Sequence, residues 1–127
     1  MKSFIDLLSE ANSEIKTISV DELKLISDDP QTQIIDVQSK DVIDNSGMIP
    51  NAIHANRGFL EFYADQREDN PFRKSEINNE KKIIVYCGVG GQGALATKTL
   101  QDMGFKDVSL LEGGVTKWQE DGYKLKK

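Results

Sequence analysis

The sequence lacks most of the residues from which disulfides and metal sites are built. Its 127 residues include one cysteine, Cys87, and one histidine, His54. A single cysteine cannot form an internal disulfide, and no Cys-x-x-Cys or Cys/His cluster is present to hold zinc. We therefore expect no bound metal and no cofactor. If Cys87 reacts, its partner sulfur must come from another molecule.

Long apolar runs and an excess of positive charge are also missing. No apolar stretch approaches the roughly 20 residues that a membrane span requires. Residues 1–16 lack the basic start, the apolar run and the cleavage site of a secretory signal, so we expect a cytoplasmic protein. Sixteen basic residues against 21 acidic ones give a net charge of −5 with no basic stripe. This balance disfavours nucleic acid as a partner, and the lack of a long apolar run disfavours a membrane.

Local patterns predict helices and strands that alternate along the chain. Apolar residues at close to helical spacing predict a first helix, and Ser19 followed by Glu22 has the capping-box pattern of a second helix start. A brief helix should precede a turn at Gly47, and polar residues 67–82 should form a surface connection. Strands are further expected at 33–37, 52–54, 82–87 and 108–114, and helices at 58–66, 94–103 and 115–123.

This alternation predicts one α/β domain with a mostly parallel central sheet flanked by helices on both faces. The chain is long enough for a single core, so we expect the domain to span residues 1–127, with residues 1–17 as an N-terminal helical extension. In parallel sheets, the loops beyond the carboxyl ends of the strands carry the chemistry. The stretch VYCGVGGQGA, residues 85–94, should lie at such an end.

Two hypotheses compete for this glycine-rich stretch. Gly88, Gly90 and Gly93 form a G-x-G-x-x-G pattern between a strand and a helix, which is typical of dinucleotide binding, and Glu112 lies near where an acid would hold a ribose. That fold uses the motif in its first β-α-β unit, however, and needs several strands after it. A pattern that begins at residue 88 leaves too little chain, so we rank this hypothesis second.

The other hypothesis makes Cys87 a sulfur nucleophile. Main-chain N–H groups curling around the sulfur, and the partial positive charge of a helix N-terminus, stabilise a thiolate. Glycine favours such a loop because several residues must adopt positive φ. The predicted substrate-binding loop consists of Gly88, Val89, Gly90, Gly91, Gln92 and Gly93. The structural alternative is that Cys87 is merely a small buried hydrophobic residue.

Four ordered motifs resemble those of the rhodanese-like (sulfurtransferase) domains. They are IIDVQ at 34–38, GMIPNA at 47–52, YCGVGGQGALA at 86–96 and GFKDVSLLEGGVTKW at 104–118. The segment HANRGFLEFYAD at 54–65 also resembles a bacterial branch of single-domain rhodaneses. The resemblance implies that Cys87 takes a sulfane sulfur from thiosulfate or from a protein or low-molecular-weight persulfide, becomes a persulfide itself, and passes the sulfur to a thiol or cyanide acceptor. A persulfide-carrying protein is then a further expected partner.

Several departures from the family pattern remove positive charge. The positions at which rhodaneses often carry arginines or a turn histidine are occupied here by Gln38, Met48, Gly88 and Gln92. Arg57 is the one cation that we expect near the pocket, as an anion contact, although it could equally pair with Glu61 four residues later. The resemblance therefore predicts weak activity with thiosulfate and a donor that is less charged or is itself a protein persulfide.

Other residues have simpler interpretations. Asp36 should cap the turn after its strand through main-chain N–H groups. For His54, a packed or solvated side chain is favoured over a role as general base. Gly113, Gly114 and Trp118 are expected to form a turn and a core anchor.

The same residues bear on two other functions. A cysteine phosphatase needs an arginine six residues after the cysteine, where this chain has Gly93. A catalytically weak rhodanese fold that acts as a binding or regulatory module remains the open alternative.

Overall fold

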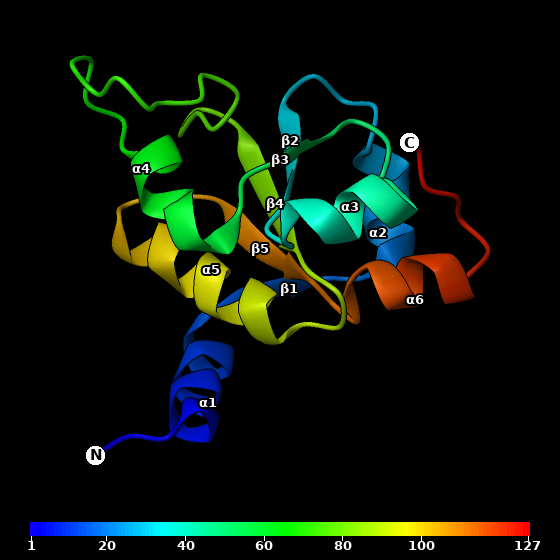
Figure 1. Ribbon diagram of the computed structural model, residues 1–127, viewed down its shortest axis with the longest axis horizontal. Coiled ribbons are helices and arrows are strands. Elements are labelled where there is room, and N and C mark those ends of the chain that lie inside the picture. Colours follow the sequence, from blue (N-terminus) through cyan, green and yellow to red (C-terminus); the bar gives the residue numbers. More distant parts are fainter.

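Helices and strands alternate along the chain in the computed structural model, which describes residues 1–127 (Figure 1). The helices are α1 (Phe4–Glu14), α2 (Val20–Ile26), α3 (Lys40–Ser46), α4 (Leu60–Ala64), α5 (Gly91–Asp102) and α6 (Gly114–Glu120), with a 3₁₀ turn at Arg57–Phe59. The strands are β1 (Lys16–Ile18), β2 (Thr32–Asp36), β3 (Ala52–His54), β4 (Lys82–Tyr86) and β5 (Val108–Leu111). None of the helices has the length and hydrophobicity needed to span a bilayer.

The five strands form one sheet in the order β1-β5-β4-β2-β3, and every neighbouring pair is parallel. Strand β4 lies at the centre, between β5 and β2. Its residues are almost continuously apolar because a central parallel strand is covered on both faces. The predicted α/β fold is thus confirmed, and the loop that follows β4 leaves the middle of the sheet at its carboxyl edge.

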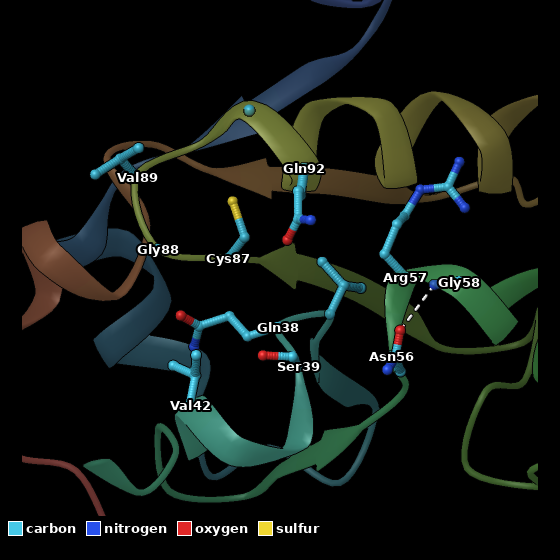
Figure 2. A pocket seen from close by; sticks show the side chains of 12 residues that line it. Gln38, Ser39, Val42, Asn56, Arg57, Gly58, Cys87, Gly88, Val89 and Gln92 are labelled. Carbon is cyan, nitrogen blue, oxygen red and sulfur yellow. Dashed lines mark hydrogen bonds between the residues drawn. The ribbon is translucent and has the colours of Figure 1, made fainter. Parts of the chain in front are cut away.

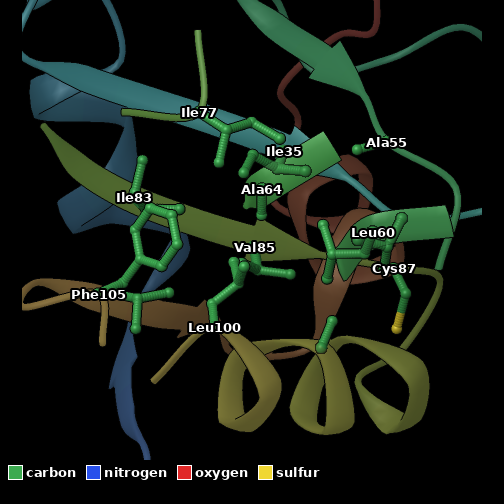
Figure 3. Packing of buried hydrophobic residues seen from close by; sticks show 13 residues of the cluster. Ile35, Ala55, Leu60, Ala64, Ile77, Ile83, Val85, Cys87, Leu100 and Phe105 are labelled. Atoms are coloured by element: carbon green, nitrogen blue, oxygen red, sulfur yellow. The ribbon is translucent and has the colours of Figure 1, made fainter. Parts of the chain in front are cut away.

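Two apolar clusters fill the space between the sheet and the helices. On one face, Ile83 and Val85 of β4 pack with Leu60 of α4 and Leu100 of α5, and Cys87 lies at the end of this cluster near Leu60 (Figure 3). On the other face, Ile84 and Tyr86 pack with α2 and with Trp118 of α6, which is the expected core anchor. Helices therefore cover both faces of the sheet, as predicted.

Helix ends follow the expected local chemistry. Ser19 accepts a hydrogen bond from the Glu22 N–H, and the Glu22 carboxylate accepts one from the Ser19 N–H, each at 3.1 Å. Helix α5 ends at Asp102 with Met103 as its C-cap, and Gly104 follows with a φ of +105° that suits glycine. The Phe105 N–H donates back to the Leu100 carbonyl at 3.1 Å. Both the predicted start of α2 and the predicted stop of α5 are confirmed.

The N-terminal segment differs from a purely helical extension. Helix α1 ends at Glu14, and Lys16–Ile18 then pairs with β5 as an edge strand that the sequence patterns did not predict. This strand has three residues, two of them exposed, so it lacks the apolar alternation that reveals longer strands. Ala11 is fully buried against the α5 side of the sheet, so α1 packs onto the domain.

The region after β3 also differs in detail. The helix expected at 58–66 is a 3₁₀ turn followed by the five-residue α4, because the Asn56 side chain caps the Gly58 N–H at 2.8 Å and Asp65 leaves the helical conformation. The connection at 67–82 has no helix or strand before Lys82, as expected, but Ile77 within it is fully buried. The connection is therefore anchored in the core rather than lying wholly on the surface.

Candidate active site

Cys87 directly follows β4 and forms part of the floor of an open pocket. The pocket has a volume of about 650 Å³ and lies between the Cys87 loop, the start of α3 and the 3₁₀ turn (Figure 2). Only 4% of Cys87 is exposed, so its sulfur is reached through this pocket and not from the open surface. The side chain is thus both packed against the core and accessible from the concave side.

The sulfur points into the curve of the glycine-rich loop (Figure 2). The Gly93 N–H donates a hydrogen bond to Sγ with an N···S distance of 3.1 Å. The five preceding N–H groups, of residues 88–92, donate to no protein atom. Unpaired N–H groups that converge on one point form an anion-binding concavity. The loop contains five N–H groups without a protein acceptor, in addition to the one that bonds Sγ.

The predicted loop and the observed one differ in extent. Helix α5 was expected to start at Ala94, but it starts at Gly91, so residues 91–93 form its first turn. Glycine weakens a helix interior, which is why the sequence suggested a later start. The sulfur contact comes from Gly93, the last residue of the predicted loop, which lies inside this first helical turn. Gly90 adopts a φ of +146° just before the helix begins.

Helix α6 holds the loop from the side opposite the pocket. The Val115 N–H donates to the Cys87 carbonyl at 3.0 Å, and the Thr116 N–H donates to the Gly88 carbonyl at 3.1 Å. Gly114 has a φ of +60°, and a Cβ there would lie 2.5 Å from both carbonyl oxygens. The pair Gly113-Gly114 was expected to be only a turn. Gly114 in addition permits the close approach of α6 to the loop after Cys87.

Neutral side chains form most of the pocket wall. Gln38 lies across from Gly88, and its amide donates to the Asp36 carboxylate at 3.2 Å. Ser39 precedes α3 without capping it, so its hydroxyl is free beside the pocket. The remaining wall residues are Val37, Val42, Asn56, Arg57, Gly58, Val89, Gly91 and Gln92. Sequence reasoning missed Ser39, Val42 and Asn56, since nothing in the local pattern marks them.

A buried polar network supports this wall from below. The Gln38 N–H donates to the Asp36 carboxylate at 2.8 Å, which confirms the predicted capping of the turn. The Tyr86 hydroxyl accepts a hydrogen bond from the Ile49 N–H at 3.0 Å. Burial, and secondarily the negative charge of Asp36, raise the pKa of Tyr86, so its phenol stays neutral. The residue before Cys87 therefore anchors the loop.

Arg57 is the only charged residue that lines the pocket, but its guanidinium is engaged elsewhere. Nη1 lies 3.1 Å from the Glu61 carboxylate, and Nη2 donates to the Thr99 hydroxyl at 3.0 Å. Of the two roles considered for Arg57, the structure has the ion pair with Glu61. A contact between Arg57 and a substrate anion stays a prediction.

His54 lies outside the pocket wall. Its Nε2 is 2.7 Å from the Gln38 carbonyl, so the ring is used to hold the turn after β2. The structure contains no group of three or more histidine, cysteine, aspartate or glutamate side chains arranged to hold a metal ion. Cys87 is the only nucleophilic sulfur in the pocket wall.

Comparisons with known proteins agree on the family. The sequence profile of the rhodanese-like domain matches residues 19–121. The chain is 32% identical over 107 residues to YtwF of Bacillus subtilis, whose name assigns it provisionally to the sulfurtransferases, covering 84% of this chain and 92% of YtwF. It is 27% identical over 108 residues to the thiosulfate sulfurtransferase GlpE of Shewanella oneidensis, covering 85% and 96% of the two chains.

One solved structure also matches the N-terminal helix. RPA3614 of Rhodopseudomonas palustris, a protein of unknown function described as a candidate tyrosine phosphatase, superposes with a TM-score of 0.90 at 33% identity. The match covers 99% of this chain and 96% of that one. Because the family profile begins at residue 19, helix α1 is an addition to the common domain that RPA3614 shares.

Proposed function

The chain belongs to the rhodanese-like domain family, and we propose that it is a sulfurtransferase whose Cys87 carries the transferred sulfur as a persulfide. The relatives that are named sulfurtransferases support the general activity. One observation carries the finer assignment. The Cys87 sulfur points into a loop in which five consecutive N–H groups have no protein partner.

In the first half-reaction, the Cys87 thiolate attacks the outer sulfur of a donor. With thiosulfate, a new S–S bond forms to Cys87, the S–S bond of the donor breaks, and sulfite leaves with the electron pair. With a low-molecular-weight or protein persulfide, the same attack releases the donor's thiolate. The product is a Cys87 persulfide whose terminal sulfur bears the negative charge. That sulfur would accept hydrogen bonds from the free N–H groups of the loop.

In the second half-reaction, an acceptor thiolate or cyanide attacks the terminal sulfur of the persulfide. The acceptor leaves as a persulfide or as thiocyanate, and Cys87 is restored as the thiolate. Splitting the transfer into two displacements lowers each barrier, and neither step needs an outside oxidant or reductant. No cofactor is required for this scheme.

The pocket wall supports a weakly charged donor over thiosulfate. Its polar groups are amides and a hydroxyl from Gln38, Ser39, Asn56 and Gln92, and its one cation, Arg57, is bound to Glu61. A thiosulfate dianion would meet main-chain dipoles and little fixed positive charge. We therefore propose a persulfide donor, either small or carried by a protein, and slow turnover with thiosulfate.

Phosphatase chemistry fits this pocket poorly. The arginine that would clamp a phosphate six residues after the cysteine is replaced by Gly93. A Cβ at Gly93 would lie 2.7 Å from Cδ1 of Leu110 and 3.4 Å from Sγ, so a larger side chain there has no room without movement. This crowding supports sulfur transfer over phosphate hydrolysis.

Mass spectrometry of the intact chain tests the proposal. After incubation with thiosulfate or with a small persulfide, the protein should gain the mass of one sulfur atom, and cyanide should remove it. Cys87→Ser is the matched control and should gain nothing, because the chain has no other cysteine. A wild-type protein that stays unmodified with both donors would support the binding or regulatory module instead.

A further inference from the structure

The single cation of the pocket is held by two residues that lie outside the pocket wall. Arg57 bonds Glu61 of α4 through Nη1 and Thr99 of α5 through Nη2, at 3.1 and 3.0 Å. The Arg57 side chain is 27% exposed and the Glu61 side chain 49%. The guanidinium thus bridges two helices at the edge of the pocket rather than projecting into it.

The bridge keeps the positive charge away from Cys87. Thr99 lies six residues after Gly93, the residue that contacts Sγ, and this separation is about 9 Å along α5 at a rise of 1.5 Å per residue. Figure 2 shows the guanidinium of Arg57 directed away from Cys87, on the far side of Gln92. While its guanidinium is bonded to Thr99 and directed away from Cys87, Arg57 does not hydrogen-bond an anion on the sulfur, since such bonds need about 2.7–3.2 Å.

The Arg57 backbone is fixed while its side chain is held only at the tip. The Arg57 N–H donates to the Val37 carbonyl at 3.1 Å and begins the 3₁₀ turn. Since the backbone is held, any movement of the guanidinium into the pocket would come from rotation about the side-chain torsions. The two hydrogen-bond acceptors, Glu61 and Thr99, oppose this rotation. The Glu61 carboxylate in addition neutralises the guanidinium charge.

We propose that Glu61 and Thr99 are specificity-determining residues, which withhold Arg57 from Cys87 and thereby select against doubly charged sulfur donors. The inference rests on the proposed sulfur transfer at Cys87. A donor with anionic oxygens would gain from the guanidinium only after breaking both contacts. A persulfide without anionic oxygens needs no such cation and loses nothing.

Donor preference in three variants tests this role. Glu61→Gln removes the charge of one acceptor, Thr99→Val removes the other, and the double variant removes both. The specificity constant kcat/KM is measured for thiosulfate and for 2-hydroxyethyl persulfide, which has no anionic oxygen. In the double variant we expect the ratio of the thiosulfate constant to the persulfide constant to rise about tenfold, equivalent to about 1.4 kcal/mol. Glu61→Gln alone should give part of this rise.

Two controls separate a freed Arg57 from a change in net charge or folding. Asp102→Asn removes the carboxylate of another i,i+4 pair, with Lys98, and should leave the ratio unchanged. Arg57→Gln added to the double variant should abolish the gain. A ratio within twofold of the wild type in the folded double variant would overturn the inference, and so would a gain that survives Arg57→Gln. Neither result touches the proposed function, which fails only if wild-type Cys87 takes sulfur from neither donor.

Discussion

Substitution of Gly114 by alanine tests how α6 holds the loop after Cys87. The φ of Gly114 is +60°, and its added Cβ would lie 2.5 Å from the Cys87 and Gly88 carbonyl oxygens. Neither oxygen can rotate away, because both belong to the main chain. Helix α6 must therefore move outward by at least about 0.5 Å, which stretches both of its hydrogen bonds to the loop to roughly 3.5 Å or more.

The expected loss of stability has two parts. A non-glycine residue in the left-handed region costs about 1–2 kcal/mol, and two weakened hydrogen bonds cost about 1–3 kcal/mol together. Gly122→Ala provides the matched control, since Gly122 has a φ of +93° and nothing lies within 4 Å of the place that a Cβ would take there. We expect Gly114→Ala to destabilise the protein by about 2–5 kcal/mol and Gly122→Ala by only about 1–2 kcal/mol.

Urea unfolding followed by circular dichroism measures both variants. The difference between them, about 1–3 kcal/mol, corresponds to a shift of the unfolding midpoint of about 1 M urea. In folded protein, uptake of sulfur by Cys87 should also slow at least about tenfold in Gly114→Ala, because the displaced loop misaligns its N–H groups. Equal midpoints, together with equal rates of sulfur uptake, would refute the claim that α6 positions this loop.

Two further predictions concern charge. Gln92→Arg places a cation on the exposed rim of the pocket and should raise kcat/KM for thiosulfate about tenfold. The control Gln119→Arg adds the same charge on α6 and should leave kcat/KM unchanged. If Gln92→Arg gives no rise, positive charge does not limit the reaction. A hydrogen bond from Lys16, aided by the charge of Lys82, lowers the pKa of Asp107 below its ordinary value of 3.8. The stabilisation by ionised Asp107 is therefore present above about pH 4 and is lost as the pH falls through the lowered pKa. The urea unfolding midpoints of wild type and Asp107→Asn should accordingly differ at pH 6 and converge near pH 2.

The features that sequence reasoning predicted are local ones. Strand β4, the loop after Cys87 and the capping box of α2 each depend on residues within one short segment. Their patterns are therefore visible without knowledge of the fold. The fold class followed from the alternation of such segments, and the family motifs reinforced it.

The features that were missed depend on residues far apart in the chain. Strand β1 exists because Lys16–Ile18 completes the edge of the sheet beside β5, about 90 residues later by the paired positions. The early start of α5 runs against the low helix propensity of Gly91 and Gly93, and the packing of this turn against Cys87 and Leu110 overrides that propensity. The hydrogen bond from the Arg57 guanidinium likewise ends on Thr99, 42 residues later, and no local pattern links the two residues.

The contacts of α6 explain why the loop offers N–H groups to the pocket. In a trans peptide unit, the carbonyl and the N–H point in opposite directions, and the chain has no cis peptide bond. The carbonyls of Cys87 and Gly88 are both bound by α6 amides. The N–H groups of Gly88 and Val89, which share those peptide units, must therefore point away from α6, toward the side where Sγ and the pocket lie. Helix α6 contributes no residue to the pocket wall, yet it sets the direction in which these two N–H groups point. In the proposed sulfur transfer, this loop would supply positive potential from the main chain, and a donor of small charge would need no side-chain cation.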